Sequence, residues 1–96
     1  MTVLGMVDER HLVFPDPKER YDSGRDVVLF RGKEGEKIVQ CAISKEALED
    51  HFAGVSKDLS KIFNANRERI EHEARCKYLA GNLEDDGSVL IRTGDL

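Results

Sequence analysis

Hydrophobic and polar positions follow a strand-like pattern in the first half of the chain. Residues 26–31 are apolar on both faces, as in a central strand, and residues 36–43 alternate with a period of two. The alternation places three residues on one face: Val39, Cys41 and Ile43. Between the two segments, Gly32-Lys33-Glu34-Gly35 predicts a tight loop, because glycine tolerates positive φ. These patterns together predict a β-hairpin.

Shorter strands are expected on either side of this hairpin. Residues 11–14 are typical of a strand that a proline stops, and residues 88–93 are typical of a last strand before a tail at 94–96. Residues 18–25 are polar and predict a loop, with Tyr21 as the group that holds it to the body. Residues 1–10 fit a short strand and a frayed end equally well.

The second half of the chain has helical spacing. Ser44 is a natural N-cap for a helix near 45–52, which Gly54 would end in a left-handed conformation. A second, longer helix is predicted over 58–80, with Gly81 at its end. Either Ser56 or Asp58 would cap its start, and its apolar residues share one stripe: Leu59, Ile62, Phe63, Ile70, Ala74 and Tyr78.

These elements predict an α+β fold. We expect a mostly antiparallel sheet of three or four strands, with two helices packed on one face in the order β-β-β-α-α-β. A chain of 96 residues is too short to divide its core, so residues 1–96 are expected to form a single domain.

Charge and composition weigh against several classes of protein. The net charge is −4 and the basic residues are interleaved with acids, which disfavours a broad nucleic-acid footprint. A weaker alternative is nucleic-acid binding through the basic residues of the long helix: Lys57, Lys61, Arg67, Arg69, Arg75 and Lys77. The sequence contains neither a signal-peptide pattern nor an apolar run long enough to span a bilayer, so we expect a cytoplasmic protein without membrane contact.

The two cysteines are the main candidates for chemistry. Cys41 on its strand face is expected to be a small core residue, and both thiols are expected to be free. An alternative is a small thiol-dependent enzyme or hydrolase in which Cys41 or Cys76 acts with a histidine. His72 and Cys76 have the spacing at which two ligands share a metal, yet no motif supplies further ligands. We therefore predict no catalytic residue, metal site or cofactor.

Three polar residues of the long helix fall inside or beside its sheet-facing stripe: Asn66, Glu73 and Lys77. Polar groups there must be paired or must border an opening. One interpretation is that Glu73 and Lys77 form an ion pair one turn apart and that Asn66 bonds a loop. The other is a polar-lined groove between helix and sheet that receives a partner or small ligand, with Arg67 and Arg69 at its rim.

The function that these features favour is a non-enzymatic binding or regulatory module with a protein partner. An unpaired edge strand, or the exposed sheet face that carries Ile38, would also allow two copies to form a homodimer.

Several segments resemble a known family. Val39-Gln40-Cys41-Ala42-Ile43-Ser44-Lys45-Glu46-Ala47-Leu48-Glu49-Asp50-His51-Phe52, then Asn66-Arg67-Glu68-Arg69-Ile70-Glu71, residues 74–78, and Asp86-Gly87 before a closing strand are similar to the domain of unknown function 1488 family. These are small, uncharacterised bacterial proteins. The resemblance extends from about His11 to Leu96, and it implies a compact α+β fold without assigning an activity, cofactor or catalytic residue.

Overall fold

The computed structural model describes residues 12–15, 18–52 and 57–96. Its sheet has four strands, which are β1 (Arg20–Asp22), β2 (Val27–Glu34), β3 (Lys37–Ser44) and β4 (Val89–Ile91). They lie in the order β1-β2-β3-β4, with antiparallel pairing of β1 to β2 and of β2 to β3, and parallel pairing of β3 to β4. The predicted α+β class with a mostly antiparallel sheet is confirmed.

The hairpin is confirmed, but its loop is shorter than predicted. β2 runs through to Glu34, so the turn consists of Gly35, at φ 60°, and Glu36. Gly32 lies inside β2 and pairs with Val39. A Cβ at Gly32 would lie only 2.9 Å from Leu12 Cδ1. Gly32 therefore provides room for close packing, and the role in the loop that we predicted for it is wrong.

The first strand lies later in the chain than predicted. Of the predicted strand at 11–14, the described part makes a single antiparallel bridge, between Val13 and Lys33. The strand β1 instead forms inside the segment that we expected to be a loop. Tyr21 belongs to β1, and its hydroxyl donates a hydrogen bond to Asp26 Oδ1 at 2.8 Å. Pairing with the neighbouring β2 overrides the polar character of this stretch.

The described residues also form three α-helices and a short C-terminal 3₁₀ helix, which are α1 (Lys45–His51), α2 (Leu59–Ala65), α3 (Arg67–Ala80) and η2 (Thr93–Asp95). The Ser44 cap is confirmed, since its hydroxyl accepts from the backbone N–H of Ala47 at 3.0 Å. Asp58, one of the two predicted caps, accepts from Ser60 and Lys61. Predictions about residues 1–10 and Gly54 fall outside the described residues.

The predicted helix over 58–80 is divided in two at Asn66. This residue has φ −124° and ψ 21°, which is not helical backbone. Its side-chain amide donates to the carbonyl of Ile62 at 2.9 Å, in competition with the backbone ladder. The prediction of one continuous helix was wrong at this point, although Gly81 ends α3 in the left-handed conformation as expected, with φ 78°.

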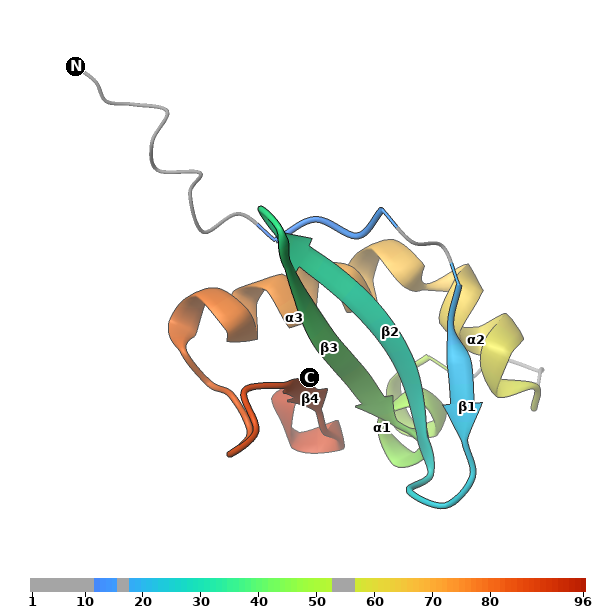
Figure 1. The fold of residues 1–96 in the computed structure, drawn as a ribbon. Coiled ribbons are helices and arrows are strands. Elements are labelled where there is room, and N and C mark those ends of the chain that lie inside the picture. The colour runs from blue at the N-terminus through green and yellow to red at the C-terminus, as the bar shows by residue number, and fades with distance from the viewer. Residues whose placement is uncertain (1–11, 16–17, 53–56) are drawn as a thin grey trace.

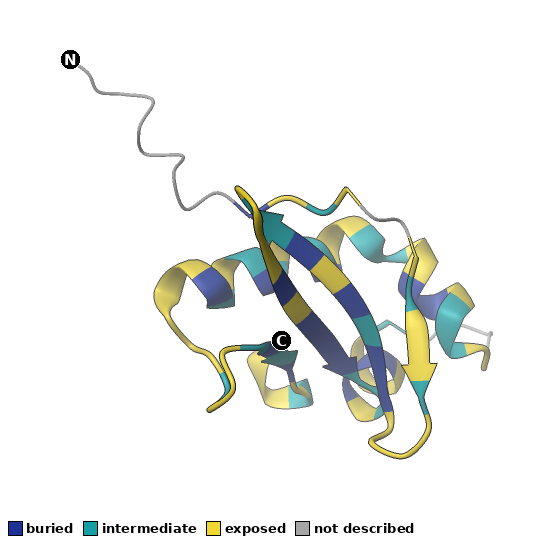
Figure 2. Cartoon of the chain, viewed as in Figure 1, coloured by how far each residue is buried: buried dark blue, intermediate teal, exposed yellow. Residues whose placement is uncertain are grey.

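The helices lie on one face of the sheet, as Figure 1 shows, and the core lies between the two layers. Buried and exposed residues alternate along the middle strands, which marks the two faces (Figure 2). The buried cluster between sheet and helices includes Val28, Phe30, Val39, Cys41, Ile43, Val89 and Ile91 from the sheet and Ala47, Leu48, Ile62, Phe63, Ile70, Ala74 and Tyr78 from the helices.

The C-terminal residues are docked, whereas the sequence predicted a tail. Thr93 donates from its hydroxyl to Asp50 at 2.7 Å, and its carbonyl lies 2.9 Å from His51 Nε2. Lys77 of α3 forms an ion pair with Asp95 at 2.7 Å. These contacts hold η2 against α1 and α3.

Candidate functional site

The three polar residues predicted on the sheet-facing side of the long helix have separate roles. Asn66 bonds within its own helix and breaks it, so the expected bond to a loop is not made. Lys77 pairs with Asp95 in η2, where an ion pair with Glu73 was expected. Glu73 is half-buried on α3. The structure thus gives Asn66 a contact within α2 and Lys77 a contact with η2.

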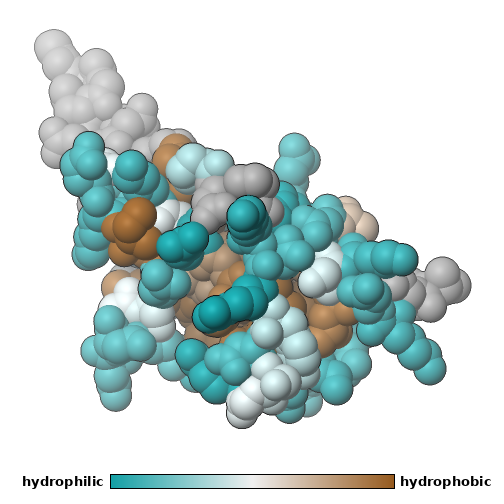
Figure 3. All heavy atoms as spheres, turned by 45° about the vertical axis from the view of Figure 1, so that its right-hand side comes forward, coloured by the Kyte–Doolittle hydropathy of each residue, from teal (hydrophilic) through white to brown (hydrophobic). Residues whose placement is uncertain are grey.

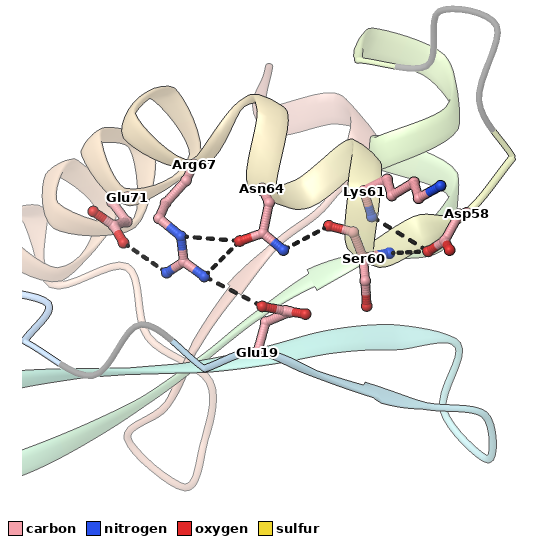
Figure 4. Close-up of polar contacts among 7 residues, drawn as sticks. All are labelled: Glu19, Asp58, Ser60, Lys61, Asn64, Arg67 and Glu71. Atoms are coloured by element: carbon pink, nitrogen blue, oxygen red, sulfur yellow. Dashed lines mark hydrogen bonds and ion pairs between the residues drawn. The ribbon is translucent and has the colours of Figure 1, made fainter.

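Arg67 holds the junction between α2 and α3 to the start of the sheet (Figure 4). Its guanidinium donates to Glu71 at 3.1 Å, to Glu19 at 3.3 Å and to Asn64 at 2.9 Å. It also stacks over the ring of Phe63, with 4.8 Å from Cζ to the ring centroid. Arg67 is therefore bound within the molecule.

Arg69 makes a similar cation–π contact, with its Cζ 5.4 Å from the centroid of the Phe52 ring. The predicted groove with Arg67 and Arg69 at its rim stays a prediction.

The thiols occupy different environments. Cys41 is 1% exposed, and burial raises the pKa of its thiol to about 12, so it stays protonated at neutral pH. Cys76 is exposed on α3, and its Sγ lies 3.5 Å from His72 Nε2. Among the described residues, no group of three or more histidine, cysteine or acidic side chains is arranged to hold a metal ion.

In the part of the chain that the structure describes, the face of the sheet opposite the helices carries no helical layer. Strand alternation and the pairing register place side chains from all four strands there, and we name this surface the open face: Arg20, Asp22, Val27, Leu29, Arg31, Lys33, Ile38, Gln40, Ala42, Ser44 and Leu90. Ile38 is 51% exposed, and Leu29 and Leu90 are each half-buried. This surface therefore presents Ile38 and parts of Leu29 and Leu90 to solvent, whereas Ala42 is buried.

Hollows run across the open face from one edge of the sheet to the other. A hollow of about 450 Å³ at the β1 side and one of about 260 Å³ near the centre share Arg20, Leu29 and Gln40. The central hollow also shares Asp86 and Leu90 with a third, of about 530 Å³, at the β4 side. In the space-filling view, hydrophobic surface is recessed among hydrophilic side chains (Figure 3).

Charge is distributed unevenly over this surface. The β1–β2 side carries Arg20 and Arg31, whereas the loop before β4 carries Asp85 and Asp86. Hydrogen bonds from the hydroxyl and backbone N–H of Ser88, at 2.6 and 2.9 Å, hold the pKa of the Asp86 carboxyl below its usual value. Asp86 is therefore a carboxylate at neutral pH.

Comparison with known proteins identifies the family. The model of the protein of unknown function family DUF1488 matches residues 12–91. The chain belongs to the DUF1488 family. It is similar to the crystal structure of a DUF1488 protein of unknown function from Shewanella loihica PV-4, with a TM-score of 0.75 and 16% sequence identity over 85% of this chain and 92% of that one. No match to a curated protein was found.

Membership in the DUF1488 family confirms the resemblance that the sequence indicated. At 16% identity, the likeness to the Shewanella protein establishes the fold. The family match covers all four strands, so the open face belongs to the matched part of the chain. Among the described residues of this DUF1488 protein, no helix is long and apolar enough to cross a bilayer. Its cytoplasmic location stays a prediction.

Only some residues of the open face could be predicted from the sequence. It placed Ile38 there and indicated that residues 26–31 are apolar on both faces. It did not indicate that Leu29, Ala42 and Leu90 lie side by side, because this depends on the register of β2 with β3 and on the parallel pairing of β3 with β4. Arg20 was missed because β1 was predicted to be a loop.

Native thiol reactivity separates the two cysteines of this DUF1488 protein. We expect one thiol per chain to react with an aromatic disulfide reagent in the folded protein and two after denaturation, because only Cys76 is exposed. Cys76→Ser should abolish the native reaction, and Cys41→Ala should leave it unchanged. Rapid labelling of Cys41 in the native state would contradict the burial described above.

Proposed function

We propose that this DUF1488 protein is a non-enzymatic binding module that holds a protein partner on its open face. The observation that carries the proposal is a sheet face without a helical layer that presents apolar side chains among polar ones, above all Ile38 at 51% exposure. Apolar side chains exposed within a polar surround are typical of interaction sites in folded proteins. Arginines at the edge suit such a site, since arginine is enriched at interfaces.

The state of the thiols supports binding over thiol chemistry. A nucleophilic cysteine needs access to substrate and a thiolate, and Cys41 is buried with a raised pKa. Cys76 contacts His72 on an exposed turn of α3, and the hollows of the open face are lined by other residues. An exposed pair alone does not supply the substrate pocket that acyl transfer requires.

The contacts of the basic residues also disfavour nucleic-acid binding through the helices. Arg67 is held by Glu19 and Glu71, Arg75 donates to the carbonyl of Leu12 at 2.8 Å, and Lys77 pairs with Asp95. Phosphate binding would compete with these contacts within the chain.

Site-specific photocrosslinking in cells of the native host tests the proposal. A photoreactive phenylalanine analogue at Gln40, which is exposed on the open face, should yield protein adducts on illumination. The matched control is the same analogue at Glu68, which is exposed in the first turn of α3 on the helical side. Adducts from position 40 and not from position 68 are the expected result. Absence of adducts at position 40, or the same adducts from both positions, would overturn the proposal.

A further inference from the structure

We infer that the partner on the open face is a second copy of this chain, stacked face to face about a two-fold axis parallel to the strands. This inference rests on the proposed function, because it names the partner of the same surface. Homodimers with a two-fold axis bury the same patch of both copies, so the patch must be complementary to itself. The open face meets this requirement in geometry and in charge.

The geometric argument comes from one row of side chains across the sheet. The register aligns Arg20 with Leu29, Leu29 with Ala42, and Ala42 with Leu90, from the β1 edge to the β4 edge. A two-fold axis parallel to the strands reverses this row in the second copy. Leu29 of one copy then lies over Ala42 of the other, and Arg20 lies over the Leu90 end. The apolar middle of the row thus meets itself, as in aligned packing of two sheets.

The charges at the two ends of the row are of opposite sign. The β1–β2 end carries three basic groups, Arg20, Arg31 and Lys33, against one carboxylate, Asp22. The β4 end carries three carboxylates against two guanidinium groups: Glu84, Asp85 and Asp86 against Arg25 and Arg92. The same axis that stacks the apolar middles brings each basic end over the acidic end of the other copy. Complementary potentials of this kind fix orientation and speed association.

The hollows accommodate the long side chains of a second copy. Arg20 lies at the β1 end of the row, and after the two-fold rotation it faces the hollow of about 530 Å³ that Asp86 and Leu90 line. An arginine there keeps its guanidinium beside carboxylates while its methylene groups cover apolar surface. The arginine side chains of each copy would thus fill hollows that two flat sheets would leave empty between them.

Edge-to-edge pairing is the less favourable route to a dimer. Both edge strands, β1 and β4, are three residues long. Such short edges offer few backbone hydrogen bonds to a second chain, and short edge strands are a common means of preventing edge pairing. The open face presents side chains from all four strands.

Charge reversal with analytical ultracentrifugation tests the inference on the full chain. We expect the unmodified chain to be a dimer at tens of micromolar. Arg20→Glu and Asp86→Lys should each weaken the dimer by about tenfold or more, because each places like charges opposite one another. The double variant Arg20→Glu/Asp86→Lys should regain affinity to within about threefold of the unmodified chain, because the pair is restored across the axis. Lys61→Glu is the control for Arg20→Glu, because it makes the same charge change at an exposed position of α2. It should leave the affinity of the dimer unchanged.

The fold of each variant is checked by its thermal melting curve, since Asp86 also bonds Ser88. A monomer at all concentrations would overturn the inference, and so would a double variant no tighter than either single variant. The crosslinking experiment separates this failure from that of the proposed function. Adducts from Gln40 that contain only this chain support both statements, whereas adducts with another protein support the proposed function alone and overturn the inference.

Discussion

Replacing Phe63 with alanine is expected to lower the free energy of unfolding by about 3–5 kcal/mol. The Phe63 side chain is 0% exposed, and its ring centroid lies 5.1 Å from that of Phe30. The guanidinium of Arg67 lies over the same ring, with its Cζ 4.8 Å from the centroid. Truncation removes apolar contact with the sheet and leaves a cavity between α2 and β2, because the surrounding backbone relaxes only partly. A domain of this size has a total stability of about 5–15 kcal/mol, so a large share would be lost.

Urea denaturation followed by far-ultraviolet circular dichroism measures this effect, since the chain contains no tryptophan. Leu79→Ala is the matched control, because Leu79 is 43% exposed on α3, and its cost should stay within about 0.5 kcal/mol. A loss below about 1 kcal/mol for Phe63→Ala would mean that α2 does not pack on the sheet as described.

Substitution of Gly32 by valine should lower the free energy of unfolding by about 1–3 kcal/mol. Gly32 lies in β2 on the core face, where a Cβ would come within 2.9 Å of Leu12 Cδ1 and 3.0 Å of Phe14 Cε1. Leu12 is fully buried and cannot move without shifting its neighbours. The strand backbone itself would accept valine readily. Gly94→Val is the control, because nothing lies within 4 Å of a Cβ at that position.

A double-mutant cycle identifies steric overlap as the cause. Leu12→Ala alone should cost about 2–5 kcal/mol through the cavity that it opens. Gly32→Ala should cost less in the Leu12→Ala background than in the unmodified chain, with a coupling free energy of about 0.5–3 kcal/mol. Equal costs in the two backgrounds would show that the requirement for glycine has another origin.

Local patterns predicted much of the fold correctly. The alternation of residues 36–43, the caps at Ser44 and Asp58, and the left-handed Gly81 all lie as expected. Each of these features depends on neighbours in sequence. The strand depends on the side-chain period, the caps depend on a hydroxyl or carboxylate beside free backbone N–H groups, and the left-handed helix end depends on a residue without Cβ. The family resemblance agreed with these local signals and is confirmed.

The helix break at Asn66 shows where local reasoning failed. The apolar stripe continued across this position, with a spacing of seven from Phe63 to Ile70, which predicted one continuous helix. Either a helical or a broken backbone is acceptable for asparagine, since its side chain competes for backbone groups. Packing on both sides decides between them, because α2 and α3 each bury their own residues against the sheet.

The candidate binding surface was predicted only in outline. The exposed position of Ile38 is confirmed, and the polar groove around Asn66, Arg67, Arg69, Glu73 and Lys77 stays a prediction. The sequence contained little indication of β1 or of the row across the sheet, because strand order and register depend on contacts between distant segments. The pairing of β3 with β4 joins residues 41–43 to residues 89–91.

The amino-acid sequence alone determined the class of the fold, the hairpin, the helix caps and the burial of Cys41, because periodicity and backbone preference act over a few residues. The tertiary structure alone decided the division of the long helix, the strand β1, the role of Gly32 and the composition of the open face. All four depend on pairing or packing between elements, which side-chain period and backbone preference do not specify. The proposed binding function belongs to this second group, since its surface comes from all four strands.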